Sequence, residues 1–497
     1  MNMKQLLTTK SIFKNKQTAW LLVGFFALRI LSYLLMNQPI IQAILVFGLI
    51  MAFGIIYFKE THYGWYIILG EMFLGGSGHF LEFFGLSIRT LLILTFMFLW
   101  ILHHAFSKKY KWRLHIKHAI FYTFFPFIIF LILAAGIGIY NGNGFVQVVQ
   151  DAIPFSYFIL LLPFYHYFYK EHTQEYLVRL LFVFLLGSAI FALFTYILFT
   201  TGTAEVNISP YYTWFRDVAM GKITDMGNGF FRIVTPEHLL LVPGVLMISS
   251  LLMRNEKHNR YWYGFLALGM LILVFDFSRT YMLALAVGLL ILKYKHKIKN
   301  WFRVSAMAMA IFLGLFFSIN ILSSGFTSTG LELLGVRIAS LGNPAIETSA
   351  YTRMALLEPI GQLISKKPLI GNGLGASISF IVPDTYEYLT TTEFDWGYLE
   401  LLAELGMLGF LSFLAILILT LYELMIKIES LSDYRDFYVG LLAGLVSLLV
   451  MTVTSPALFH VFGVFYLTIV LVLAMKPISI FERTLTLLYR VFNRLEK

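Results

Sequence analysis

Long, almost uninterrupted apolar runs dominate the hydrophobic pattern of this chain. A membrane-spanning helix needs about 20 mostly apolar residues to cross roughly 30 Å of hydrocarbon. The stretch at 64–82 is the weakest candidate, because Glu71, His79 and a glycine-rich run interrupt it. Fourteen stretches come near this length, centred on 18–37, 39–57, 64–82, 87–106, 119–140, 150–169, 179–200, 235–253, 261–276, 280–294, 301–323, 398–424, 435–454 and 459–475. The pattern predicts an all-α, polytopic membrane protein with 12–14 transmembrane helices.

Two connections are longer than the others, at about 202–234 and 324–397. The second contains a helix-like stretch near 349–365 with an apolar face made of Met354, Leu357, Ile360 and Ile364. An amphipathic helix of this kind is typical of a membrane surface. We therefore expect residues 1–497 to form a single integral membrane domain, with 324–397 as a large external loop that carries amphipathic helices.

The distribution of lysine and arginine predicts the orientation. With the N-terminus in the cytoplasm and fourteen alternating spans, 27 of the 37 lysines and arginines fall in cytoplasmic segments and nine on the other side, with Arg29 inside a span. Cytoplasmic loops of membrane proteins carry such an excess. We expect both termini to be cytoplasmic and the first apolar run to be a retained anchor.

The composition excludes several classes of protein. The chain has 497 residues, of which 59% are hydrophobic and 13% charged, and its mean hydropathy is +0.78. A soluble enzyme, a disordered chain and a nucleic-acid-binding module are all incompatible with these values. The absence of cysteine removes disulfides, thiolate metal sites and cysteine nucleophiles. The histidines of the basic segment near 103–118 are not expected to bind metal.

Charged side chains near the predicted external ends of the spans are the candidate chemical groups. Arg232 and Arg279 flank spans, and Arg353 lies in the long loop. A guanidinium grips phosphate through two parallel hydrogen bonds and stays charged in a partly dry site. Converging arginines could hold a diphosphate and stabilise its charge as it leaves. Asp395, at the end of the long loop, is the candidate general base for an attacking hydroxyl.

Each of these residues also has an ordinary structural explanation. Arg279 could reach lipid head groups, and Arg353 could belong to a surface helix. Asp395 could cap the helix that follows it. Glu404, on that helix, could pair with a neighbouring helix. The run Gly371–Gly375 lacks a strand–turn–helix context, so it predicts a turn that allows close backbone approach rather than a nucleotide-binding loop.

Three motifs of the C-terminal half resemble the bacterial O-antigen ligase and polymerase superfamily. They are Thr352-Arg353 followed by the Pro-Leu-x-Gly-x-Gly-like run Lys367–Gly375, the helix Gly397–Gly409, and Ser278-Arg279 followed by Leu283–Gly288. The three occur in the order and spacing of the family around one long external loop. The resemblance covers about residues 225–460.

The resemblance implies an all-helical membrane glycosyltransferase that uses undecaprenyl-diphosphate-linked glycans, without nucleotide sugar, cofactor or metal. It assigns diphosphate binding to Arg279 and Arg353. Ligases of the family have a histidine eleven positions before the helix glycine, and counting back from Gly406 gives Asp395 instead. A carboxylate can still act as a general base. The departure favours a polymerase over a ligase.

We therefore expect a polymerase of O-antigen, capsule or exopolysaccharide in the bacterial cytoplasmic membrane. Its substrates would be an undecaprenyl-diphosphate-linked donor and a sugar hydroxyl on another lipid-linked repeat unit, with membrane lipids as its surroundings. The sequence leaves open the sugar, the linkage, the oligomeric state, the role of residues 1–200 and the need for a chain-length regulator.

Two alternatives remain at this stage. A ligase would use the same machinery to join the glycan to a lipid or protein acceptor. A lipid-linked oligosaccharide flippase or transporter would carry charged residues along a midplane cavity and show repeat symmetry. Arg29 and Glu71 are the residues that could belong to such a path.

Overall fold

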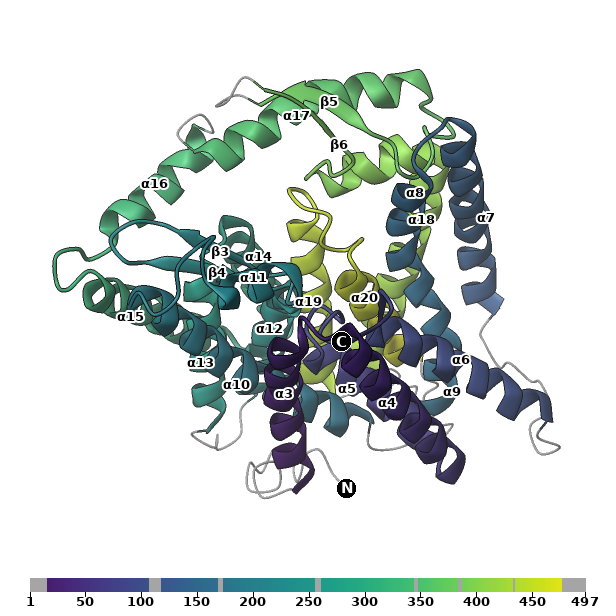
Figure 1. Ribbon diagram of the computed structural model, residues 1–497, viewed down its shortest axis with the longest axis horizontal. Coiled ribbons are helices and arrows are strands. Elements are labelled where there is room, and N and C mark those ends of the chain that lie inside the picture. Colours follow the sequence, from purple (N-terminus) through teal and green to yellow (C-terminus); the bar gives the residue numbers. More distant parts are fainter. Residues whose placement is uncertain are drawn as a thin grey trace, which may run out of the picture. The chain divides into compact units, whose positions relative to one another are not determined.

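The computed structural model describes residues 16–106, 118–168, 173–254, 261–343, 347–382, 387–431 and 434–475. Helices form most of it, and three two-stranded antiparallel sheets connect them (Figure 1). Within the described part, eight helices are long and apolar enough to cross a membrane, and four shorter apolar helices accompany them. The prediction of an all-α polytopic membrane protein is confirmed.

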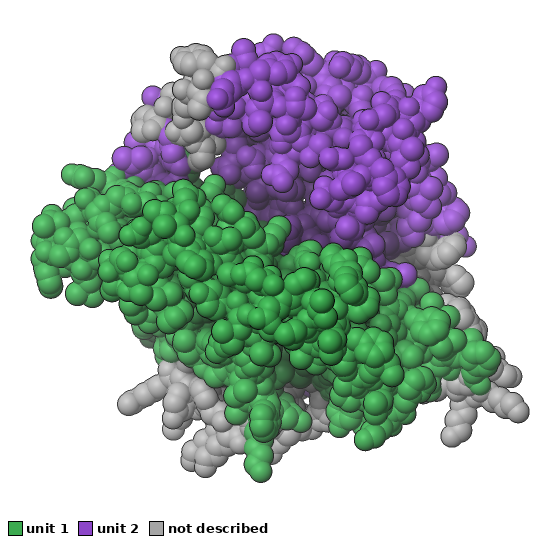
Figure 2. Space-filling view, viewed as in Figure 1, with its two compact units in different colours: residues 1–114, 162–282, 296–333 green, residues 115–161, 283–295, 334–497 purple. Residues whose placement is uncertain are grey.

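The chain forms two compact units, which Figure 2 colours separately. Unit 1 comprises residues 1–114, 162–282 and 296–333, and unit 2 comprises 115–161, 283–295 and 334–497. The unit boundaries divide α14 (Arg279–Leu292) and α16 (Leu331–Gly342), and they separate Leu161 from the rest of α9 (Leu161–Tyr167).

Unit 1 is built around buried helices. Its elements are α3 (Lys16–Leu35), α4 (Pro39–Lys59), α5 (His62–Leu74), β1 (Glu82–Phe83), β2 (Leu86–Ser87), α6 (Ile88–Phe106), α9 (Leu161–Tyr167), α10 (Thr173–Thr200), α11 (Pro210–Asp217), β3 (Lys222–Asp225), β4 (Phe231–Val234), η2 (Pro236–Leu240), α12 (Leu241–Leu252), α13 (Tyr261–Asp276) and α15 (Ile298–Ser323). Every residue of α12 is buried, as expected of a helix that is apolar on all sides. Helix α13 packs against α10, α12 and α15.

The β3–β4 hairpin of unit 1 positions Arg232. Strand β4 pairs antiparallel with β3, and Thr224 lies opposite Arg232. The turn between the strands is made by Gly227, Asn228 and Gly229, which all have positive φ. Asp225 Oδ1 accepts a hydrogen bond from Gly227 N at 2.8 Å, a side-chain turn that favours this reversal. Arg232 is therefore held on a short, ordered strand.

Unit 2 is arranged around one long helix, α18 (Gly397–Ser430). The other elements of unit 2 are α7 (His118–Tyr140), α8 (Phe145–Ser156), η1 (Tyr157–Leu160), α17 (Thr348–Lys366), β5 (Ile378–Ile381), β6 (Tyr388–Thr391), α19 (Arg435–Met451) and α20 (Val461–Met475). Helices α7, α19 and α20 pack against α18, and α8 packs against α7 and α20. The helix expected over 349–365 is α17, whereas the β5–β6 hairpin was not predicted.

Helix α18 is interrupted at Gly406, where φ is +68° and ψ is −177°. The loop 367–375 fills the interruption. Four backbone hydrogen bonds join loop and helix, from Asn372 N to Ala403 O (2.8 Å), Gly373 N to Glu404 O (3.0 Å), Met407 N to Pro368 O (2.9 Å) and Leu408 N to Leu369 O (3.2 Å). Non-helical backbone inside a membrane protein needs such partners, since lipid offers none.

The glycines of this loop are required by its conformation. Gly371, Gly373 and Gly375 all have positive φ. A side chain at Gly371 would collide with the backbone of Glu404, and one at Gly373 with the backbone of Gly138 on α7. The prediction of a turn that allows close backbone approach is confirmed.

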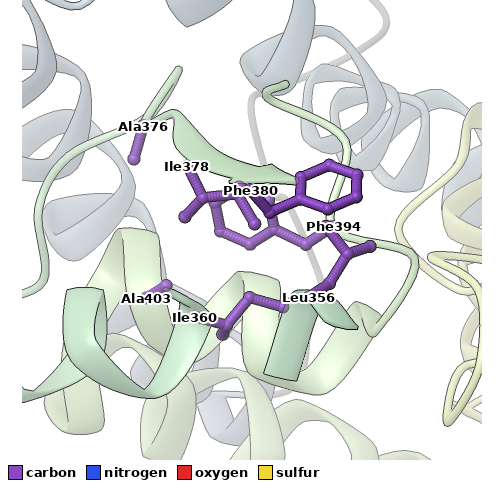
Figure 3. Close-up of a cluster of buried hydrophobic side chains, with 7 residues drawn as sticks. All are labelled: Leu356, Ile360, Ala376, Ile378, Phe380, Phe394 and Ala403. Carbon is purple, nitrogen blue, oxygen red and sulfur yellow. The ribbon is translucent and has the colours of Figure 1, made fainter. Parts of the chain in front are cut away.

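A small apolar core joins α17, the β5–β6 hairpin and the start of α18 (Figure 3). It consists of Leu356, Ile360, Ala376, Ile378, Phe380, Phe394 and Ala403. From the apolar face expected on this helix, Ile360 is fully buried in the core, whereas Met354 is exposed. This core fixes α17 against the residues that precede α18.

Candidate functional site

Arg353 and Asp395, two of the predicted site residues, lie together in unit 2. Arg353 Nε is 3.5 Å from Asp395 Oδ2. The side chains are 29% and 45% exposed, so the ion pair is loose and open to solvent on one side. Arg353 Nε is buried and makes no hydrogen bond within the described chain. The arrangement leaves donor groups of the guanidinium available for a ligand.

Local structure brings the two residues together. Trp396 Nε1 donates a hydrogen bond of 2.8 Å to Arg353 O, which ties α17 to the start of α18. Asp395 has a φ of +59°, a left-handed conformation that costs free energy and is often found at functional sites. Helix α18 begins at Gly397 and its N-cap is Trp396, without a side-chain capping bond. The alternative of Asp395 as the helix cap is therefore wrong, because the chain turns one residue too early.

Three carboxyl groups of α18 and α8 lie near one another in the same unit. Gly375 N donates to Asp151 Oδ2 at 2.7 Å and to Glu404 Oε1 at 3.1 Å, so these two carboxyl groups are neighbours. Glu400, one turn before Glu404, interacts electrostatically with Asp151 and Asp395. Its Oε2 atom is buried and has no hydrogen-bond partner in the described residues. The expected pairing of Glu404 with a neighbouring helix is confirmed, and α8 is that helix.

Asp151 was not among the residues predicted from the sequence. It is the one carboxylate in α8, a mostly apolar helix. An ionisable residue within such a helix is costly in lipid and usually has a specific partner, so this signal could have identified it. Its contact with Gly375, 224 residues later, could not be read from the sequence.

Arg232 and Arg279, the other two predicted arginines, belong to unit 1. Arg232 Nε donates a hydrogen bond of 2.6 Å to Asp276 O, at the end of α13. Arg279 is the first residue of α14. Asp276 is fully buried, and His238 Nδ1 lies 3.2 Å from its Oδ2. Because Arg353 belongs to unit 2, convergence of the arginines of the two units on one ligand stays a prediction.

Arg29 and Glu71, the residues that a transport path could have used, each form an ion pair inside unit 1. Arg29 Nη2 lies 2.8 Å from Glu237 Oε1, and Arg89 Nε lies 2.8 Å from Glu71 Oε2. Both guanidinium groups are buried, and each also donates to backbone carbonyls near residues 74–77. A pocket of about 700 Å³ lies among α3, α4, α5 and Tyr176, and Glu71 is the one charged residue among the described residues that line it. These charges are neutralised by the fold of unit 1.

The described part of the chain contains no group of three or more His, Asp or Glu residues arranged to hold a metal ion.

Comparison with known proteins supports the resemblance seen in the sequence. Residues 240–414 match the family model of the O-antigen ligases (Wzy_C). No curated protein matches the chain. The matched segment includes Asp276, Arg279, Arg353 and Asp395, whereas Arg232 lies just before it. The resemblance to the O-antigen ligase/polymerase superfamily is confirmed over this segment.

Proposed function

Because residues 240–414 resemble the O-antigen ligase/polymerase superfamily, we propose that this protein is a polysaccharide polymerase. It transfers a glycan chain from undecaprenyl diphosphate to a sugar hydroxyl on another lipid-linked repeat unit. The reaction takes place at the outer face of the bacterial cytoplasmic membrane. The product is O-antigen, capsule or exopolysaccharide.

The loose ion pair of Arg353 and Asp395 is the observation that carries this proposal. A guanidinium and a carboxylate 3.5 Å apart and half open to solvent can exchange partners when a ligand arrives. A diphosphate binds the guanidinium through two charge-assisted hydrogen bonds, which are stronger than the loose pair. Its arrival frees the Asp395 carboxylate to accept a hydrogen bond from the acceptor hydroxyl.

The reaction then follows from these two roles. The acceptor oxygen attacks the anomeric carbon of the donor sugar and passes its proton to the Asp395 carboxylate. A new glycosidic C–O bond forms as the bond between the sugar and the diphosphate breaks. Undecaprenyl diphosphate leaves with the bonding electrons, and Arg353 stabilises its added negative charge. In this scheme Arg279 and Arg232 complete the diphosphate site, and neither a metal ion nor a cofactor takes part.

Substitution of Arg353 tests this function. We expect Arg353→Ala and Arg353→Lys both to abolish polymer while the protein is still inserted and folded, because lysine cannot reproduce the planar fork. The control is Lys366→Ala, which removes an exposed cation from the same helix. The measurement is the length distribution of lipid-linked glycans in cells that carry each variant, with protein level checked in the membrane fraction. Unchanged polymer in both arginine variants excludes the proposed role.

The ligase alternative is separated by the product. A ligase moves a finished chain to a lipid or protein acceptor and leaves the lengths of lipid-linked glycans unchanged. A polymerase is required for any lipid-linked chain longer than one repeat unit. Loss of the protein should therefore reduce lipid-linked glycans to single units, and accumulation of long lipid-linked chains would identify a ligase.

The proposed orientation has its own test, because the chain lacks cysteine. Single cysteines introduced by Lys366→Cys and Lys59→Cys place a thiol on each predicted side of the membrane. We expect a membrane-impermeant maleimide applied to intact spheroplasts to label position 366 and spare position 59. Labelling of position 59 alone would reverse the topology and remove the active site from the outer face.

A further inference from the structure

The junction between α13 and α14 is strained and tightly held. Phe277, between the two helices, has a φ of +41°, a region that bulky residues rarely occupy. Its fully buried ring stacks on Phe316 at 5.0 Å and meets Phe230 edge-on at 5.7 Å. A strained residue persists only where its surroundings enforce it. Here the rings of Phe316 in α15 and of Phe230, just before β4, supply that enforcement.

The break presents a backbone carbonyl to Arg232. Helix α13 ends at Asp276, and the last carbonyls of a helix have no partner within the helix. Arg232 Nε donates to Asp276 O at 2.6 Å. Arg232 makes no other hydrogen bond within the described residues, so Nη1 and Nη2 remain available. The side chain is 25% exposed, which lets a ligand reach this terminal fork.

The carboxylate of Asp276 faces the same guanidinium. Its Oδ1 atom is buried, has no hydrogen-bond partner in the described chain and lies 3.9 Å from Arg232 Nη2. Its Oδ2 atom lies 3.2 Å from Nδ1 of the buried His238. A fully buried carboxylate with one unpaired oxygen is costly unless a charge nearby balances it. Asp276 thus contacts Arg232 twice: its backbone carbonyl accepts a hydrogen bond from Nε, and its carboxylate lies near Nη2.

We propose that Asp276 is the positioning residue for Arg232 and that His238 in turn holds the Asp276 carboxylate. Together they fix the guanidinium by Nε and direct Nη1 and Nη2 toward a phosphate oxyanion. The inference rests on the proposed function, because the oxyanion is the diphosphate of the lipid-linked donor. Asp276 and His238 would therefore affect the affinity for the lipid-diphosphate donor and would take no part in proton transfer.

Pyrophosphate binding by the purified full-length protein tests the inference. Isothermal titration calorimetry with sodium pyrophosphate compares the wild type with Asp276→Asn, Arg232→Gln and their double variant. Asp276→Asn keeps the backbone carbonyl and the shape of the side chain and removes its charge. Asp217→Asn is the control, because it removes a carboxylate of an exposed arginine pair in the same unit.

We expect Arg232→Gln to weaken pyrophosphate binding by about tenfold or more, the loss of charged hydrogen bonds from one fork. Asp276→Asn should weaken it about fivefold, because the fork is then no longer aimed. The double variant should match Arg232→Gln within about twofold, since Asp276 acts through Arg232. Asp217→Asn should bind like the wild type.

Two results would overturn the inference. Asp276→Asn could bind pyrophosphate as tightly as the wild type, or more tightly. That result would show that the negative carboxylate only weakens the attraction of the site for an anion and does not orient Arg232. The two single effects could multiply in the double variant, which would show that they are independent. If Asp276→Asn fails to fold in gel filtration, His238→Gln replaces it, with an expected weakening of about twofold to threefold and the same criteria.

The outcome is separable from that of the proposed function. If loss of the whole protein leaves long lipid-linked glycans in place while Asp276→Asn loses pyrophosphate affinity, the polymerase proposal fails and the positioning role stands. If the Arg353 variants lose polymer and Asp276→Asn binds normally, the positioning role alone fails.

Discussion

The two units treat their charged groups in different ways. In unit 1, Arg29 and Asp276 are buried, and Arg29, Arg89 and Arg232 each donate a hydrogen bond to a backbone carbonyl. In unit 2, Arg353 and Asp395 are partly exposed and held by a 3.5 Å contact without a hydrogen bond between them in the described structure. Buried charges that lose a partner destabilise a protein strongly, whereas exposed pairs contribute little. The buried charges of unit 1 are therefore held in place, whereas the Arg353–Asp395 pair of unit 2 can exchange partners.

The largest expected effect is on the reaction rate and lies in unit 2. Asp395→Asn should lower the polymerisation rate about 10²–10⁴-fold, the usual contribution of a general base. It should change the free energy of unfolding by less than about 1 kcal/mol, because the ion pair is exposed. The measurement is initial polymer formation in membranes, with Glu393→Gln as a control two residues earlier. A rate within tenfold of wild type would remove Asp395 from the mechanism.

A comparable change in unit 1 should act on stability. Arg29→Ala leaves Glu237 buried without its cation and should cost about 3–5 kcal/mol of unfolding free energy. Arg216→Ala, which breaks an exposed pair with Asp217 in the same unit, should leave the unfolding midpoint unchanged. Both are measured by denaturation of the purified protein followed by tryptophan fluorescence. Equal effects of the two substitutions would contradict the contrast between buried and exposed charge.

The loop 367–375 of unit 2 should be rigid, although the Arg353–Asp395 ion pair of the same unit is loose. Gly373→Ala places a side chain against the backbone of Gly138 at a φ of +88°. The left-handed conformation and the required backbone shift should together cost about 2–5 kcal/mol. Thermal unfolding in detergent measures the loss. A variant as stable as the wild type would show that the loop does not pack as described.

The smallest expected effect is a stabilisation. Gly361 lies in α17, where an added side chain meets nothing within 4 Å. Gly361→Ala should therefore raise the unfolding free energy by about 0.5–1 kcal/mol, because alanine favours a helix interior over glycine. It is the matched control for Gly373→Ala under the same measurement. A loss of stability here would indicate that α17 is covered by a partner.

Local properties of the sequence were the ones that predicted structure correctly. Lipid imposes length and composition on each span, so hydropathy alone predicted the helical membrane fold. The glycine-rich run 371–375 likewise predicted a turn that another backbone segment approaches closely. Contacts between distant residues were not predictable, because Arg29 and Glu237 are 208 residues apart. Asp395 was offered as a helix cap because its residue type favours that role, but its positive φ gives the cap to Trp396. The packing of Phe277 between Phe230 and Phe316 could not be predicted from the hydropathy pattern.

The insertion of loop 367–375 into the Gly406 interruption also constrains biosynthesis. The loop is synthesised before residues 403–408, so Asn372 N and Gly373 N cannot form their hydrogen bonds to Ala403 O and Glu404 O until this part of α18 has also been made. The amides of Met407 and Leu408 in turn need the carbonyls of the loop, because the break at Gly406 interrupts the hydrogen bonding of the helix. The loop and α18 therefore complete their backbone hydrogen bonds only together, which makes the folding of this part of unit 2 cooperative.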